Sequence, residues 1–207
     1  MKKLTTLIAI ILFVSCKSET KKEAIINVKT ETEKPSEITS SEKSKNNGTY
    51  LCTINGKAWH YTKASGIVSR HKKTNKHEAI FTFTKQLEKG KETLQLTYDG
   101  DTNQLERISV HLKVPKKDGG RMTAMYLYHP NTTKFHPNAK ISGSIDLSNS
   151  SNATGNAKVS DLEVRFDKEN VKNEDDTVIT VKGINFKGIG YSEAGKQFGS
   201  KGTSANN

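Results

Sequence analysis

Two cysteines and six histidines are the side chains of this chain best suited to bind a metal ion or to act as nucleophiles. A zinc site needs three or four such ligands in a fixed geometry, and their spacing here follows no zinc-ligand pattern. Cys52 stands alone in an apolar segment, which indicates a small core residue. We therefore expect no metal, no cofactor and no catalytic residue. A glycan-active enzyme, which needs only two carboxylates far apart in sequence, is a weaker alternative.

Positive charge is the chemical feature that remains. The chain carries a formal charge of +11, and residues 49–207 hold 24 basic and 16 acidic side chains. A folded domain this basic attracts polyanions. The alternative is that the lysines only keep the domain soluble and prevent its edge strands from pairing with other chains.

The basic residues gather in particular connections between expected strands. If these strands follow one another as a meander, alternate loops lie at the same end of the domain. The loops 85–92 and 115–121 then share one end with the connection before Gly66. The basic residues placed at this end are Lys63, Lys85, Lys89, Lys91, Lys116, Lys117 and Arg121.

The elements that must position this cluster read as strands. Hydrophobic residues alternate with polar ones along several segments, a period of two that predicts strands with one buried face. The expected strands are 50–54, 57–61, 67–71, 79–84, 93–98, 105–114, 122–128, 141–147, 159–166 and 178–186. Between the first two, Asn55-Gly56 predicts a type I′ hairpin, because both central residues need positive φ.

About ten strands in 140 residues predict an all-β domain, an antiparallel β-sandwich with a lipocalin-like β-barrel as the alternative. The two differ in function as well as shape. A barrel would carry a small apolar molecule, with aromatic and methionine side chains near its mouth: Trp59, Tyr98, Met122, Met125 and Tyr126. A sandwich, whose interior is filled by side chains, would instead bind a partner on its surface.

The N-terminal segment has the order of an export signal. Lys2 and Lys3 precede an apolar run of eight residues, Leu7 to Val14, which is too short to span a membrane and has the length of a signal-peptide core. We expect residues 1–15 to be a signal peptide and residues 16–48 a polar, disordered tether. Residues 49–191 form the β-domain, and residues 192–207 a flexible tail.

The end of the apolar run, Phe13-Val14-Ser15-Cys16, resembles the bacterial lipobox. This resemblance implies cleavage before Cys16 and lipidation of its thiol, so that the protein is held at a membrane. Lys17 in the next position resembles lipoproteins of the outer membrane, on its periplasmic or its outer face. In that compartment the expected partners are an anionic glycan, lipopolysaccharide or an envelope protein, and nucleic acid is excluded.

The hairpin Thr-Ile-Asn-Gly-Lys-Ala-Trp, residues 53–59, resembles the opening of small cell-envelope lipoproteins of Bacteroidetes. That family resemblance implies an antiparallel β-domain of poorly defined function. Asp176-Thr177-Val178 resembles the site at which such bacteria O-glycosylate exported proteins. It makes Thr177 a candidate glycosylation site.

Overall fold

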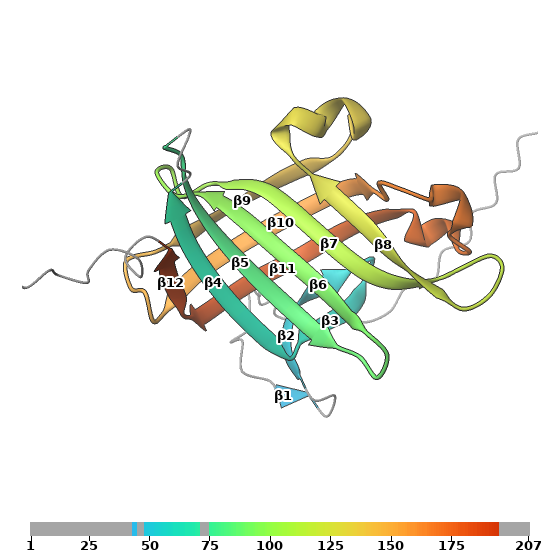
Figure 1. Cartoon of the computed structure of the whole chain (residues 1–207), viewed down its shortest axis with the longest axis horizontal. Coiled ribbons are helices and arrows are strands. Elements are labelled where there is room, and N and C mark those ends of the chain that lie inside the picture. Colours follow the sequence, from blue (N-terminus) through green and yellow to red (C-terminus); the bar gives the residue numbers. More distant parts are fainter. Residues whose placement is uncertain (1–42, 45–47, 71–74, 195–207) are drawn as a thin grey trace, which may run out of the picture. The chain divides into compact units, whose positions relative to one another are not determined.

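Two β-sheets make up the part of the chain that the structure describes (Figure 1). The computed structural model describes residues 43–44, 48–70 and 75–194. The expected signal peptide, Cys16, most of the tether and residues 195–207 lie outside the described residues.

The first sheet has the strand order β1-β2-β11-β10-β9, with β3 paired to β2. Its strands are Lys43–Ser44 (β1), Gly48–Ile54 (β2), Lys57–Tyr61 (β3), Lys140–Asp146 (β9), Ala153–Glu163 (β10) and Val178–Ile189 (β11). The second sheet has the order β12-β4-β5-β6-β7-β8. Its strands are Lys63–Arg70 (β4), His77–Gln86 (β5), Lys91–Asp99 (β6), Leu105–Pro115 (β7), Arg121–Tyr128 (β8) and Tyr191–Ala194 (β12). The 3-10 helices of the described chain are Pro130–Phe135 (η1), Lys168–Asn170 (η2) and Glu174–Asp176 (η3).

The β2–β3 hairpin turns as the sequence predicts. Asn55 and Gly56 have φ values of 47° and 76°, the pair of positive angles that a type I′ turn requires. The Asn55 side chain also joins this hairpin to β11 and to the 3-10 turn before it. Its Nδ2 donates to the carbonyl oxygens of Asp175 (2.8 Å) and Val178 (3.0 Å), and its Oδ1 accepts from the Thr180 amide at 2.8 Å. The turn thus reverses the chain and also attaches the hairpin to β11 through the Asn55 side chain.

The two sheets form a sandwich, and they do not close into a barrel. The all-β sandwich is confirmed, and the alternative barrel is not formed. Of the side chains expected near a barrel mouth, Trp59, Tyr98 and Tyr126 are buried in the core between the sheets. The meander β4 to β8 is antiparallel throughout, which fixes the ends at which its turns lie.

Aromatic side chains from both sheets meet in the core. The Phe186 ring of β11 lies 5.3 Å from the Phe81 ring and 5.1 Å from the Phe83 ring of β5, measured between centroids. Gly155 of the neighbouring strand β10 makes room for it, because a Cβ atom there would lie 2.4 Å from Phe186 Cζ. Phe186 therefore bridges the two layers in a space that a glycine leaves open.

Several sequence expectations were wrong at their boundaries. The strand expected over 67–71 is β4, which begins at Lys63, so Lys63 lies in a strand and not in the connection before Gly66. The strand expected over 159–166 is β10, which ends at Glu163, and Phe166 is 57% exposed instead of buried. Beyond the strand, the Arg165 amide donates to the Met125 carbonyl at 2.8 Å, so the backbone has left its own sheet. The expected tail begins too early, because Tyr191–Ala194 forms β12 and pairs in parallel with β4.

Candidate anion-binding site

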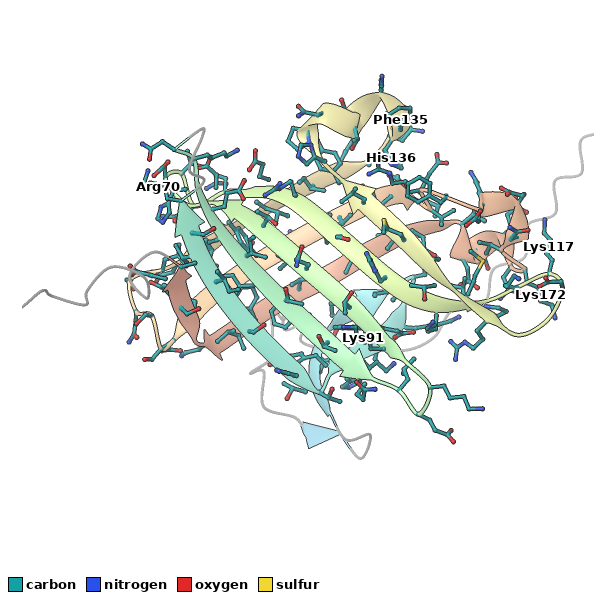
Figure 2. The ribbon with its side chains drawn as sticks, viewed as in Figure 1. Arg70, Lys91, Lys117, Phe135, His136 and Lys172 are labelled. Carbon is teal, nitrogen blue, oxygen red and sulfur yellow. The ribbon has the colours of Figure 1, made fainter. Side chains whose placement is uncertain are left out.

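The meander brings the expected basic cluster to one end of the second sheet. Gln86 pairs with Lys91 across the β5–β6 turn, and Pro115 pairs with Arg121 across the β7–β8 turn. Because successive strands are antiparallel, both turns lie at the end where β4 begins with Lys63. Figure 2 shows Lys91 beside the start of β6 and Lys117 in the loop after β7. The shared end that the sequence predicts is present.

Three cations from different elements surround an open hollow at this end. The hollow has a volume of about 630 Å³ and is lined by Leu87, Glu88, Lys89, Lys113 and Arg121. Lys89 comes from the β5–β6 turn, Lys113 from β7 and Arg121 from β8. None of the three forms an ion pair among the described residues. We call these three residues the basic triad.

Hydrogen bonds hold two members of the basic triad in place. Lys113 Nζ donates to Thr123 Oγ1 at 2.7 Å, and Arg121 Nη2 donates to the Lys113 carbonyl oxygen. The Lys113 stem also lies close to Gly90, where an added Cβ would come within 3.3 Å of its Cε. Lys113 was not among the expected basic residues, although the alternation of residues 105–114 places it on the polar face of its strand.

Lys85, in contrast, is held by a buried carboxylate. Glu92 is 7% exposed, and its Oε2 lies 3.5 Å from Lys85 Nζ and accepts from Trp59 Nε1 at 3.0 Å. Its Oε1 accepts from the Lys113 amide at 3.2 Å. Lys85 is therefore paired with a carboxylate, unlike the members of the basic triad.

Lys116 and Lys117 also differ from the basic triad. Lys116 Nζ lies 3.0 Å from Asp118 Oδ2 within its own loop. The Lys117 amide donates to the Asn170 carbonyl at 3.0 Å, and its side chain lines a separate cleft of about 1,170 Å³. That cleft mixes basic and acidic residues: Lys57, Lys117, Lys168, Lys172, Glu169, Glu174, Asp175 and Asp176. Its charges balance, which makes it a poor site for a polyanion.

Thr177 lies beside the exposed turn that was expected to present it, but the residue itself is only 9% exposed. Its Oγ1 donates to the Glu174 carbonyl at 2.7 Å, which closes the 3-10 turn. Attachment of a sugar would require this turn to open first, so glycosylation of Thr177 stays a prediction without structural support.

Lys91 acts on a neighbouring histidine. The pKa of His111 lies below its ordinary value, chiefly because the ring is partly buried and then because the Lys91 ammonium repels the protonated form. Replacing Lys91 with Gln removes the second cause, so we expect the His111 pKa to rise when followed by NMR titration.

Lys63→Gln is the matched control for this titration. Lys63 pairs with Thr84, and this row continues across β6 to His111. Lys63 is thus three strands from β7, so its charge lies roughly 14 Å from His111 and is largely screened. An equal rise of the His111 pKa in both variants would mean that overall charge, and not contact with Lys91, sets it.

The remaining candidate ligands are scattered. Cys52 is fully buried, as expected of a core residue, and burial raises the pKa of its thiol to about 12. Within residues 43–44, 48–70 and 75–194, no group of three or more His, Cys, Asp or Glu side chains could hold a metal ion. Across the same residues, no helix is both long and apolar enough to span a membrane.

Fold and site together define a two-sheet sandwich with a basic triad at one end. Comparison of the chain with protein-family models, with curated proteins and with solved structures found no match. The geometry and charge of the basic triad are therefore the basis for the function of this protein.

Proposed function

We propose that this protein is a lipid-anchored envelope protein whose β-sandwich binds an anionic glycan at the basic triad. The observation that carries the proposal is the hollow among Lys89, Lys113 and Arg121, three cations that form no ion pair among the described residues. Glu88 is the one carboxylate that lines this hollow.

The arrangement suits a repeating polyanion better than a single small ligand. The hollow is open, and Lys63 and Lys91 lie at the same end of the sheet. Arg121 presents a planar fork of N–H donors that matches sulfate, phosphate and carboxylate groups, and lysines add compact charges. Each exposed ion pair contributes only about 0.2–1 kcal/mol, so affinity has to come from several contacts at once.

The anchor and the compartment belong to the same proposal. Lipid on Cys16 would hold the chain at the outer membrane, and the residues between Cys16 and β1 would connect it to the sandwich. The sandwich would then sample the glycans and lipopolysaccharide above the headgroups.

Neutralising the basic triad tests the binding. We expect Lys89→Gln, Lys113→Gln and Arg121→Gln together to weaken retention on heparin resin, corresponding to about a tenfold loss of affinity at physiological salt. The measurement is the salt concentration that elutes the chain from Lys17 onward, which keeps every residue the structure describes. Wild-type retention should itself fall steeply as salt rises.

A control of equal charge separates the site from general basicity. Lys134→Gln, Arg165→Gln and Lys187→Gln also remove two lysines and one arginine, and none of these lines the hollow. Equal elution of the two triple variants would show that only net charge matters, and the binding proposal would fail.

A further inference from the structure

The outer face of the first sheet carries a second hollow, which the sequence did not predict. It has a volume of about 540 Å³ and lies over β9, β10 and β11, on the sheet that Figure 1 shows behind the meander. Six polar residues line it together with Ile141, Val159, Val181 and Gly183; the six are Lys140, Ser142, Lys158, Ser160, Thr180 and Lys182. We call this hollow the sheet groove.

Two β-bulges of opposite sense lie beside each other in the sheet groove. Ala157 pairs with Ile184, and Val159 pairs with Val181. Between these two pairs β10 has one residue, Lys158, whereas β11 has two, Lys182 and Gly183, so the extra residue lies on β11. Between Val159 and Leu162 the extra residue lies on β10 instead, at Ser160 and Asp161.

Left-handed backbone accompanies each bulge. Gly183 has a φ of 70° and Asp161 a φ of 56°. Bulges twist a strand locally and re-aim its side chains, and they are common next to binding sites. A Cβ added to Gly183 would meet nothing within 4 Å, so the glycine opens directly onto free space.

Positive charge in the sheet groove is concentrated and uncompensated. The Lys158 and Lys182 side chains are exposed neighbours on adjacent strands, and like charges so placed destabilise a sheet. Their next neighbours across the sheet are neutral, Ser142 beside Lys158 and Thr53 beside Lys182.

No carboxylate offsets these lysines within the groove. Lys140 is the third lysine of the groove, beside Lys158 and Lys182. None of the three forms an ion pair among the described residues. Asp161 lies in the β10 bulge but does not line the groove. An anion in the groove would therefore relieve a repulsion that is built into the sheet.

We propose that the sheet groove binds the phosphate monoester of a sugar. Three lysines supply charge for one compact anion, and the hydroxyls of Ser142, Ser160 and Thr180 can bond to sugar hydroxyls. The volume is that of ordinary small-ligand sites, roughly 300–1,000 Å³. No aromatic side chain lines the groove, so it has nothing on which a neutral sugar ring could stack.

This site is separate from the basic triad. The groove lies on the outer face of the first sheet, whereas Lys89, Lys113 and Arg121 belong to the second, and the two hollows share no residue. Failure of one proposal leaves the other standing.

Titration of the chain from Lys17 onward with glucose 6-phosphate, followed by amide NMR shifts, tests the site. We expect shifts centred on residues 140–142, 158–160 and 180–183 with glucose 6-phosphate, weaker ones with inorganic phosphate, and none with glucose. Lys158→Gln with Lys182→Gln should weaken binding at least tenfold. Gly183→Asn, which keeps the charge and tolerates positive φ, should also weaken it because its side chain enters the groove.

Lys187→Gln is the control on the same face of β11, because Lys187 pairs with Thr154 outside the groove. It should leave the glucose 6-phosphate affinity unchanged. An equal loss in Lys187→Gln and Lys158→Gln, or shifts spread over all basic surfaces, would overturn the proposal.

Thermal unfolding gives an independent readout. At low salt and without ligand, Lys158→Gln should raise Tm by about 1–3 °C, since it removes the repulsion from Lys182. Glucose 6-phosphate should raise Tm of the wild type and leave that of the double variant unchanged. A lower Tm of Lys158→Gln would contradict the built-in repulsion.

Discussion

Replacing Phe186 with Ala is expected to lower the free energy of unfolding by about 3–5 kcal/mol, the range for phenylalanines truncated in a core. Phe186 is 4% exposed and contacts Phe81 and Phe83 of the opposite sheet. Gly155 lies against the ring and has no side chain with which to fill the space that the truncation leaves. Urea unfolding of both proteins, followed by circular dichroism, measures the difference.

Phe166→Ala is the matched control, because the same atoms are removed from the surface. Phe166 is 57% exposed, and its ring packs under the Arg165 guanidinium at 5.1 Å from the centroid. Loss of this cation–π contact costs about 0.5–1 kcal/mol. If the two truncations cost the same, Phe186 would not be the bridge between the sheets that the structure describes.

Replacing Cys16 with Ala is expected to release the protein from membranes entirely. The thiol is the expected point of lipid attachment, and each buried lipid CH₂ contributes about 0.8 kcal/mol, so several acyl chains hold a protein almost permanently. Separation of cells into membrane and soluble fractions, combined with palmitate labelling, measures the change. We expect soluble protein without label.

Cys52→Ala is the control for this experiment. It removes the other cysteine, which is fully buried and whose thiol is not available for acylation. The variant should stay in the membrane fraction and keep its palmitate label. Membrane attachment of the Cys16→Ala protein would show that another segment anchors the chain, and the lipoprotein proposal would be abandoned.

Local residue patterns determined the strands of this protein. Alternation along residues 105–114 and 79–84 predicted β7 and β5 within a few residues, because each strand buries one face against a single core. Asn55-Gly56 determined its turn, since few residues tolerate positive φ at both positions. The shared end of the two basic turns also followed, because antiparallel neighbours in a meander leave little choice.

Long-range pairing lay beyond the sequence pattern. Sandwich and barrel bury the same alternating positions, so only the tertiary structure excluded closure. The parallel pairing of β12 with β4 joins residues 191–194 to residues 66–69, and no local signal marks such a contact. Phe166 followed the alternation of β10, but the strand ended before it and left the ring outside.

The candidate sites show the same division at the level of single side chains. The sequence determined where lysines occur, whereas the tertiary structure decided which keep their charge unpaired. Lys85 pairs with Glu92, whose carboxylate also accepts a hydrogen bond from Trp59 of the other sheet. Lys158 and Lys182 become neighbours only through the bulged register of β10 and β11. Electrostatic interactions depend on distance in space. Lys158 and Lys182 are 24 positions apart in the sequence and come close to each other only when the chain folds.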